Sequence, residues 1–319
     1  MRRVFFVLAC ILLATSFSSC EKEAKKSEKW SDTTTTGVVP ITCDECYLPI
    51  IRAEIDVFES IYTSANILPI YTNEVEAIDL LLQDSVRLAV VSRELSENEK
   101  AAFLAKKMQA RSRKIAVDAI ALIVNKENQD TIIGVPTLKK ILTGEITDWN
   151  QIYPKSKLGK IDVMFDNPNS STVRYAIDSI CRGEALSDGL YAQKTNLDVV
   201  EMVSKYPNSL GIIGVNWVSN ENDTINLSFN QKIKVMAVSP YEEANYYNSF
   251  QPFQAHILYG DYPLTRNVFI ILSDPKSGLS TGFTSFVMSD RGQRIILKSG
   301  LLPATQPMRV VSIVDEHIK

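Results

Sequence analysis

The chain of 319 residues contains only two histidines, and this scarcity limits the enzyme classes to which it can belong. His317 lies near the C-terminus, and His256 lies in a stretch of proline, glutamine and aromatic residues that is typical of a loop. The sequence also lacks the GxSxG, HExxH and P-loop motifs. Hydrolytic and zinc chemistry need such side chains, so the sequence predicts a protein that is not an enzyme and holds no cofactor or metal.

Excess positive charge is also missing. The chain has 34 Lys and Arg against 37 Asp and Glu, a formal net charge of −3. Its one basic cluster, Arg111, Arg113 and Lys114, is typical of a solvated edge. A mildly acidic protein has no general attraction to nucleic acid, so we expect no nucleic-acid partner.

The first twenty residues have the order of a bacterial export signal. Arg2 and Arg3 precede an apolar run, Val4 to Leu13, that is too short to span a bilayer stably. Small residues and then Cys20 follow, which resembles the lipobox of bacterial lipoproteins, with Phe17 where that pattern usually has leucine. We therefore expect residues 1–19 to be a signal peptide, although an ordinary signal with a chance cysteine is the alternative.

Lipid on Cys20 would anchor the protein to a membrane, on the periplasmic or the cell-surface side. Two acyl chains hold a protein stably there, because each buried methylene adds about 0.8 kcal/mol. Residues 20–37 are polar and include the run Thr33 to Thr36, so they are expected to form a flexible tether. No later segment is apolar over about 20 residues, so no spanning helix is expected.

Three cysteines remain in the rest of the chain. Cys43 and Cys46 form a CxxC pair, and Cys181 stands alone. Outside the cytoplasm such a pair can form a disulfide. A metal site would need a second half, which the sequence does not supply, so a disulfide and two free thiols remain the alternatives.

Hydrophobic periodicity predicts an α/β fold with a mainly parallel sheet. Leu48, Ile51, Ile55 and Phe58 are spaced by three and four residues and form one apolar helix face. Short apolar runs typical of buried strands alternate with further helices. These runs are Leu88 to Ser92, Ala116 to Val124, Ile161 to Phe165, Leu210 to Val218 and Val268 to Leu272.

Three places in the chain have side chains that suit an oxyanion. Ser170, Ser171 and Thr172 follow a predicted strand and open a helix, where hydroxyls and free backbone N–H groups bind anions or cap the helix. Thr72 lies just before another predicted helix. Ser92 and Arg93 end a strand, the position where open parallel sheets bind ligands.

Four further segments, in the right order and at the right intervals, resemble the substrate-binding proteins of phosphate ABC importers. They are Val117 to Asn125, Leu142 to Asn150, Tyr262 to Arg266 and Pro275 to Pro303. The resemblance implies a two-lobed periplasmic binding protein fold of the class II type, with the lobes joined by a two-strand hinge. It implies residues 38–117 plus 239–319 as lobe 1 and residues 118–238 as lobe 2, closing on a ligand between them.

The resemblance also implies that Thr72, Ser92, Arg93, Ser170, Ser171 and Thr172 bind phosphate or a related oxyanion. Acidic residues depart from the family pattern, which has an arginine at Asp166 and a Ser/Thr-rich turn at Asp44-Glu45-Cys46. Glu74 adds another carboxylate beside Thr72. The expected partners are phosphate, an ABC permease and a membrane reached through the lipid. The alternative is a surface or sensory lipoprotein of the same fold that binds another small ligand or a partner protein.

Overall fold

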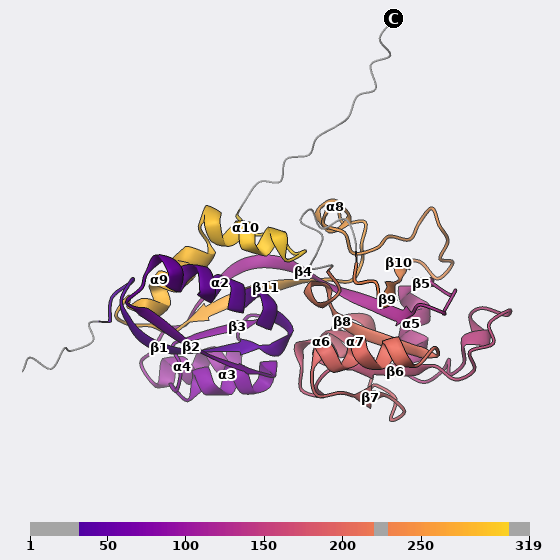
Figure 1. Ribbon diagram of the computed structural model, residues 1–319. Helices are drawn as coiled ribbons and strands as arrows, with labels where there is room; N and C mark the ends of the chain where they lie inside the picture. Colours follow the sequence, from indigo (N-terminus) through magenta and orange to yellow (C-terminus); the bar gives the residue numbers. More distant parts are fainter. Residues whose placement is uncertain (1–31, 220–228, 306–319) are drawn as a thin grey trace, which may run out of the picture.

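The computed structural model describes residues 32–219 and 229–305, and it consists of two lobes that lie side by side (Figure 1). The predicted signal peptide and Cys20 lie outside the described residues. One continuous path of strands runs through both lobes in the order β2-β1-β3-β11-β4-β8-β6-β7, with β9 and β12 also paired to β4. The strands that join the lobes are β4 (Arg111–Asn125) and β11 (Thr265–Leu272).

Lobe 1 contains the N-terminal strands and the last two helices. Its sheet contains β1 (Gly37–Asp44), β2 (Ala65–Thr72), β3 (Leu88–Val91) and β11. The short strand β12 (Leu302–Pro303) pairs with β4. In Figure 1 one group of helices lies above this sheet and another below it. The upper group is α2 (Leu48–Ile61), α9 (Leu279–Val287) and α10 (Asp290–Lys298); the lower group is α3 (Glu74–Leu82) and α4 (Glu97–Ala105).

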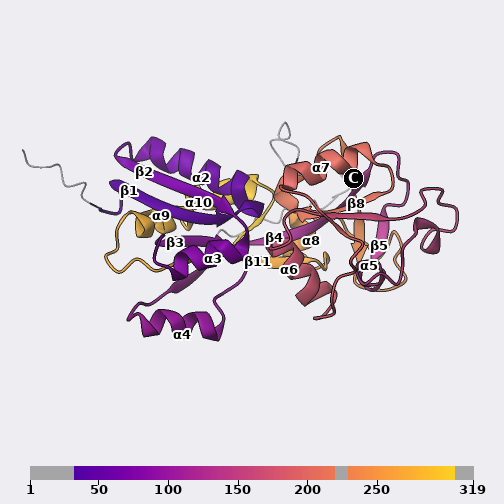
Figure 2. The same cartoon turned by 90° about the horizontal axis from the view of Figure 1, so that it is seen from below.

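Lobe 2 is built on the second half of β4. That half of β4 pairs with β8 (Ser209–Gly214) and β9 (Ile233–Val235). On the far side of β8 follow β6 (Asp162–Phe165) and then β7 (Tyr191–Ala192), and a separate pair is formed by β5 (Ile132–Gly134) and β10 (Ala237–Ser239). Its helices are α5 (Val135–Leu142), α6 (Ser171–Tyr175), α7 (Asn196–Lys205) and α8 (Gln254–Tyr259). Figure 2, which turns the molecule by 90°, shows the two lobes again as separate bodies joined through β4 and β11.

The outer strands of both lobes pair in parallel, as in β1 with β2 and β6 with β8. Pairs that involve β4 or β11 are antiparallel, because these two strands run between the lobes in opposite directions. The prediction of an α/β fold with two lobes is therefore confirmed. The parallel arrangement holds for the outer strands but not for the two strands at the centre of the path.

The hinge lies where β4 and β11 pair, with Ala119 opposite Thr265 and Asp118 opposite Arg266. The Tyr262 hydroxyl donates to the Ile120 carbonyl at 2.6 Å just before β11 begins. The sequence resemblance predicts that the chain returns to lobe 1 near residue 239. Residues 237–250 instead pack on lobe 2, because β10 pairs with β5 and Glu242 forms an ion pair with Lys140 of α5. We therefore propose that the return crossing is at residues 262–266.

Local sequence explains where several elements begin and end. The α2 helix begins with Pro49 in its first turn, where a missing N–H costs nothing. The run from Leu210 is a strand only as far as Gly214, after which Val215–Trp217 form a 3₁₀ turn that places Asn216 between the lobes. The α10 helix is capped by Ser289, whose hydroxyl accepts from the Gly292 amide.

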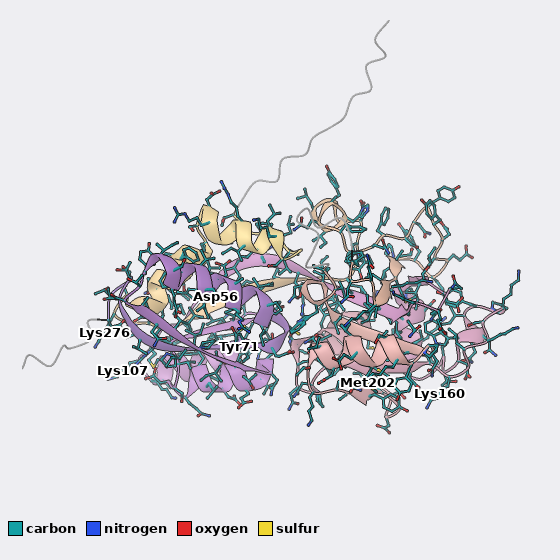
Figure 3. The ribbon with its side chains drawn as sticks, viewed as in Figure 1. Asp56, Tyr71, Lys107, Lys160, Met202 and Lys276 are labelled. Carbon is teal, nitrogen blue, oxygen red and sulfur yellow. The ribbon has the colours of Figure 1, made fainter. Side chains whose placement is uncertain are left out.

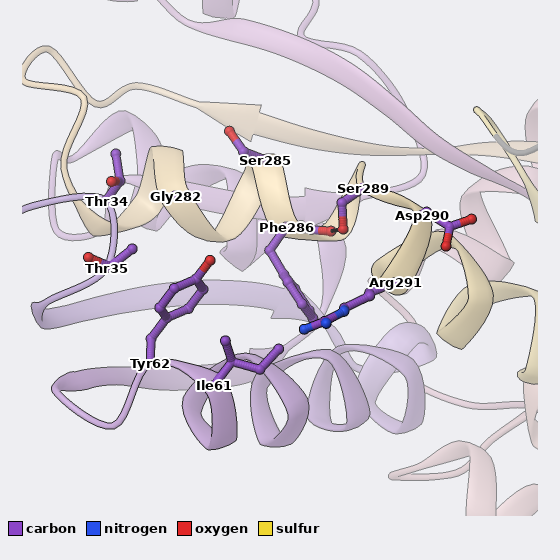
Figure 4. Close-up of a pocket in the computed structure, with 10 residues that line it drawn as sticks. All are labelled: Thr34, Thr35, Ile61, Tyr62, Gly282, Ser285, Phe286, Ser289, Asp290 and Arg291. Atoms are coloured by element: carbon purple, nitrogen blue, oxygen red, sulfur yellow. Dashed lines mark hydrogen bonds between the residues drawn. The ribbon is translucent and has the colours of Figure 1, made fainter.

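The segment just before β1 lies against the α9 helix. The Asp32 carboxylate accepts from the Leu279 amide at 2.8 Å. A Cβ on Gly282 would lie only 1.8 Å from the Thr34 carbonyl oxygen, so this close approach requires glycine. A groove of about 630 Å³ runs beside this segment, along Tyr62 and the first turn of α10 (Figure 4). It lies on the outer side of lobe 1, away from the hinge.

Among residues 32–219 and 229–305, no helix is both long enough and apolar enough to cross a membrane.

Candidate functional site

Buried polar side chains from both lobes meet beside the hinge, and we call this group the interlobe cluster. Lobe 1 contributes the turn between β1 and α2, and lobe 2 contributes the segments that precede α6 and α7 and follow β8. The hinge strands contribute a cation and a carboxylate. The cluster consists of Asp44, Glu45, Cys46, Tyr47, Asp118, Asp166, Ser170, Ser171, Thr172, Asn196, Asn216 and Arg266.

Arg266 is the cation of the interlobe cluster and is almost fully buried. Its Nε donates to Asp118 Oδ2 at 2.8 Å, and its Nη1 donates to the Ser171 hydroxyl at 2.8 Å. The guanidinium carbon also lies 5.3 Å from the ring centroid of Tyr47, within the range of a cation–π contact. Nη2 is buried and has no hydrogen-bond partner among the described residues. One donor of a permanently charged group therefore remains available at the lobe interface.

Three more buried polar atoms near Arg266 lack a partner in the described part of the chain. They are Asp44 Oδ2, the Tyr47 hydroxyl and Asn216 Oδ1. A Cβ on Gly214 would lie 2.8 Å from Asn216 Oδ1 and 3.7 Å from Arg266 Nη2, so both atoms lie close to the Gly214 backbone. Leaving a buried polar atom unpaired costs about 1–3 kcal/mol, so a polar ligand that paired these atoms would be stabilised.

Asp44 lies at the end of β1. Its Oδ1 accepts from the Cys46 amide at 3.0 Å and caps the short turn before α2. Burial, together with the nearby Glu74 carboxylate, raises the pKa of Asp44 to about 7, although Arg266 acts in the opposite direction. Near neutral pH this carboxyl group is therefore divided between its protonated and ionised forms.

Asp166 occupies the other side of the interlobe cluster. It accepts hydrogen bonds from the Ser170 hydroxyl at 2.6 Å, from Asn196 Nδ2 at 3.1 Å and from the Cys46 thiol at 3.4 Å. Cys46 Sγ also lies 3.1 Å from the Thr172 hydroxyl oxygen, so the turn of lobe 1 touches the start of α6 directly. Burial raises the pKa of Asp166, while the bonds from Ser170 and Cys46 lower it.

Cys43 and Cys46 are both buried free thiols, which decides between the two alternatives left by the sequence. Burial, followed by the charge of Asp44, raises the pKa of each thiol. A thiol that keeps its proton is a poor nucleophile and a poor metal ligand, so these side chains act here as packing and weak hydrogen-bonding groups.

A second interlobe contact involves Ser92, which the sequence predicts to be a ligand residue. Its amide and its hydroxyl both donate to Glu74 Oε1 at 2.8 Å. Arg174 of lobe 2 donates through Nε to Glu74 Oε2 at 2.5 Å and through Nη2 to the Ser92 hydroxyl at 2.7 Å. Burial would raise the pKa of Glu74, but Arg174 and Ser92 outweigh it and the pKa is lowered. Glu74 is thus an ionised carboxylate that links the lobes.

The structure separates the six predicted ligand residues into two groups. Ser170, Ser171 and Thr172 are buried in the interlobe cluster, and Ser171 is the one that contacts Arg266. The others are held by neighbouring carboxylates. Thr72 donates to Glu76, Ser92 donates to Glu74, and Arg93 binds both oxygens of Glu99 at 2.7 and 2.8 Å.

Sequence reasoning missed Arg266, Arg174, Tyr47 and Asn216 as candidate site residues. Arg266 belongs to the Tyr262-to-Arg266 segment, which the sequence analysis uses only as part of the family resemblance. The local sequence does not mark Arg266 as buried, because it stands between Thr265 and Asn267 at the polar start of β11, outside the apolar run Val268 to Leu272. Asn216 and Tyr47 gave no signal either, since their roles depend on how the two lobes meet.

As a binding site, the interlobe cluster offers one guanidinium, several hydroxyls and a set of buried acceptors. This combination suits a small oxyanion that can also donate hydrogen bonds. Within the described residues, no group of three His, Cys, Asp or Glu side chains is arranged to hold a metal ion.

Comparison with known proteins gives the class. Residues 31–291 match the family model described as the PBP superfamily domain, so the chain belongs to the PBP superfamily. It is similar to the phosphate-binding protein PstS of Borreliella burgdorferi, at 27% identity over 237 residues, covering 70% of this chain and 75% of the relative. The PstS of Pseudomonas aeruginosa is 22% identical over 262 residues, covering 77% and 76%.

Solved structures show the same fold. A protein of Clostridium perfringens assigned to phosphate ABC transport, crystallised with bound phosphate, superimposes with a TM-score of 0.70 at 20% identity and covers 84% of this chain and 99% of its own. An ABC-type phosphate transport receptor from Vibrio cholerae gives a TM-score of 0.63 at 19% identity, covering 84% and 100%. The two-lobed fold that the sequence resemblance implies is therefore confirmed, and this chain is a two-lobed member of the PBP superfamily.

Proposed function

We propose that this protein binds inorganic phosphate between its two lobes and delivers it to an ABC importer. The observation that carries the proposal is the unpaired Nη2 of Arg266, which lies at the hinge beside the Ser171 hydroxyl. An oxyanion there would receive a charge-assisted hydrogen bond from Arg266 and would pair the buried atoms that now lack partners. Its relatives are named phosphate-binding proteins, which supports phosphate as the ligand.

The site performs no covalent chemistry in this proposal. Arg266 is fixed in the hinge by Asp118, and Ser171 belongs to lobe 2, so an anion that contacts both is held where the lobes rotate against each other. A ligand that binds the closed form better than the open form shifts the protein toward closure. The closed form is the one that would dock on the permease.

We propose that the protein is exported and held at a membrane by lipid on Cys20. The support is the order of charged, apolar and small residues before Cys20. Replacing Cys20 with serine is expected to move the full-length protein from the membrane fraction to the soluble fraction of cells. Membrane association that survives Cys20→Ser would contradict the lipid anchor without touching the ligand proposal.

Isothermal titration of residues 31–319 with phosphate at neutral pH tests the ligand, with sulphate, molybdate and an organophosphate as comparisons. Arg266→Lys keeps the positive charge but cannot hold Asp118, Ser171 and the ligand together, so it should weaken phosphate binding at least tenfold. Arg294→Lys, on the exposed face of α10, is the matched control and should bind as the parent does.

Two results would count against phosphate as the ligand. One is the absence of heat with every oxyanion on protein shown to be folded. The other is tight phosphate binding that Arg266→Lys leaves unchanged. The first result would favour the second candidate, a surface or sensory lipoprotein with another ligand, which the carboxylates of the interlobe cluster motivate.

A further inference from the structure

The Glu74 carboxylate is held in the way that proteins hold a bound oxyanion. Its Oε1 accepts from the Ser92 amide and the Ser92 hydroxyl at 2.8 Å each, and its Oε2 accepts from Arg174 Nε at 2.5 Å. Arg174 Nη2 lies 3.5 Å from Oε1, and Arg93 Nε lies 3.9 Å from Oε2. A backbone amide, a hydroxyl and guanidinium groups are the donors that recognise small oxyanions.

These donors come from both lobes and form a site of their own. Ser92 and Arg93 follow β3 of lobe 1, and Arg174 belongs to α6 of lobe 2. Arg174 Nη2 also donates to the Ser92 hydroxyl at 2.7 Å, so the donors of the two lobes touch each other directly. The carboxylate enters from the first turn of α3, with its side chain only 2% exposed. Glu74 therefore fills a site whose walls do not depend on its own helix alone.

The charges at this site favour an anion. Arg93 has a second carboxylate, Glu99, which binds it at 2.7 and 2.8 Å. Among the described residues, the other ion pair of Arg174 is with Asp178 at 3.3 Å, and the Asp178 side chain is 57% exposed. Exposed ion pairs contribute little. Arg174 therefore needs an anion at the position that the Glu74 carboxylate occupies.

We propose that Glu74 is a tethered ligand: its carboxylate occupies an oxyanion site between the lobes, which a small free carboxylate or phosphate ion fills when Glu74 is absent. The tethered carboxylate holds the lobes together without a bound solute. This inference goes beyond the proposed function, because its site lies at Ser92 and Arg174 rather than at Arg266 and Ser171. A tethered group has an effective concentration on the order of millimolar or higher, so free anions at micromolar concentration do not displace it.

Removing the carboxylate should open this site to a free anion. The atoms that alanine lacks relative to glutamate correspond to acetate, so Glu74→Ala should bind acetate where the parent does not. Thermal unfolding at neutral pH in sodium acetate, compared with sodium chloride at the same concentration, measures this binding. With a Kd of about 10 mM, about 100 mM acetate should raise the unfolding midpoint of Glu74→Ala by about 2–4 °C and leave the parent unchanged.

Three variants control for other effects of acetate. Glu74→Gln keeps the site filled with a neutral side chain of the same shape, so acetate should not stabilise it. Asp56→Ala removes an exposed carboxylate from α2 of the same lobe (Figure 3) and should behave as the parent does. Adding Arg174→Met to Glu74→Ala removes the cation of lobe 2 and should abolish the effect of acetate.

The outcomes separate this proposal from the proposed function. An equal response of Glu74→Ala and Asp56→Ala to acetate would overturn the tethered ligand, and an effect that survives Arg174→Met would overturn a site between the lobes. If Glu74→Ala does not fold in chloride, refolding in acetate supports the proposal and failure to refold in acetate overturns it. Phosphate titration of the parent is independent of these results, and absence of phosphate binding there would refute the proposed function alone.

Discussion

The buried pair of Arg266 and Asp118 allows a sharp prediction about stability. The two residues are opposite each other on the hinge strands and are joined by a 2.8 Å hydrogen bond, with Asp118 fully buried. In Arg266→Met, the Asp118 carboxylate would remain in the interior without its cation. Breaking one side of a buried ion pair costs about 3–5 kcal/mol, most of it from the charge left behind.

The same reasoning predicts that a second substitution restores stability. Asp118→Asn in the Arg266→Met background removes the uncompensated charge and leaves a neutral amide of the same shape. The double variant should therefore recover most of the lost stability, giving a coupling free energy of about 2–3 kcal/mol between the two sites. Neither Arg266→Met nor the double variant should bind phosphate tightly, because both lack the Arg266 guanidinium that would bind the ligand.

The pH dependence provides an independent check. Burial raises the pKa of Asp118, and Arg266 now counteracts that effect. Without Arg266 the folded-state pKa rises further, so the cost of Arg266→Met is expected to grow as the pH rises above the folded-state pKa of Asp118 in the parent, and to shrink on acidification. Urea unfolding of the parent, both single variants and the double variant at pH 5 and pH 8 measures these terms. Additive losses at pH 8 would refute the reasoning.

Three further predictions concern lobe 1 and its contact with lobe 2. Glu54 is buried with no partner for either oxygen in the described residues, and burial raises its pKa to about 9 from 4.5. The parent therefore loses stability as the pH rises from about 4.5 to about 9. In urea unfolding, the free energy of unfolding of Glu54→Gln should exceed that of the parent by about 3 kcal/mol at pH 7, but not at pH 4. Gly282→Ala should displace Thr34 and expose the segment before β1 to limited proteolysis, unlike Gly189→Ala, whose Cβ would come no closer than 3.8 Å to a neighbouring atom. Arg174→Ala should remove the cation of lobe 2 from buried Glu74, which then keeps only its contacts within lobe 1 to Ser92 and Arg93, and should shift small-angle scattering toward a more open form; an unchanged profile would contradict the role of Arg174 between the lobes.

Much of the fold was predictable because it depends on local periodicity. The apolar spacing of Leu48, Ile51, Ile55 and Phe58 corresponds to α2, and the short apolar runs correspond to strands near their predicted positions. We propose a later crossing back to lobe 1 than the one predicted near residue 239, because the attachment of β10 to lobe 2 depends on pairing with β5, which is distant in the chain.

The candidate site was predictable only in part. The hydroxyls at Ser170, Ser171 and Thr172 stood out because three follow one another at a helix start. Thr72 and Arg93 looked equally suitable, but nearby carboxylates, Glu76 and Glu99, already hold them in the structure. Which residues face a ligand depends on contacts between lobes, and those are set by tertiary packing that local pattern does not encode.

The central claim is that phosphate binds beside the hinge, against Arg266 and Ser171. A crystal structure of residues 31–319 grown with phosphate tests it most directly. The account predicts an anion within hydrogen-bonding distance of Arg266 Nη2 and the Ser171 hydroxyl, with Asp44 Oδ2 close to another of its oxygens. Phosphate bound elsewhere, or an interlobe cluster that excludes it at saturating concentration, would contradict the account.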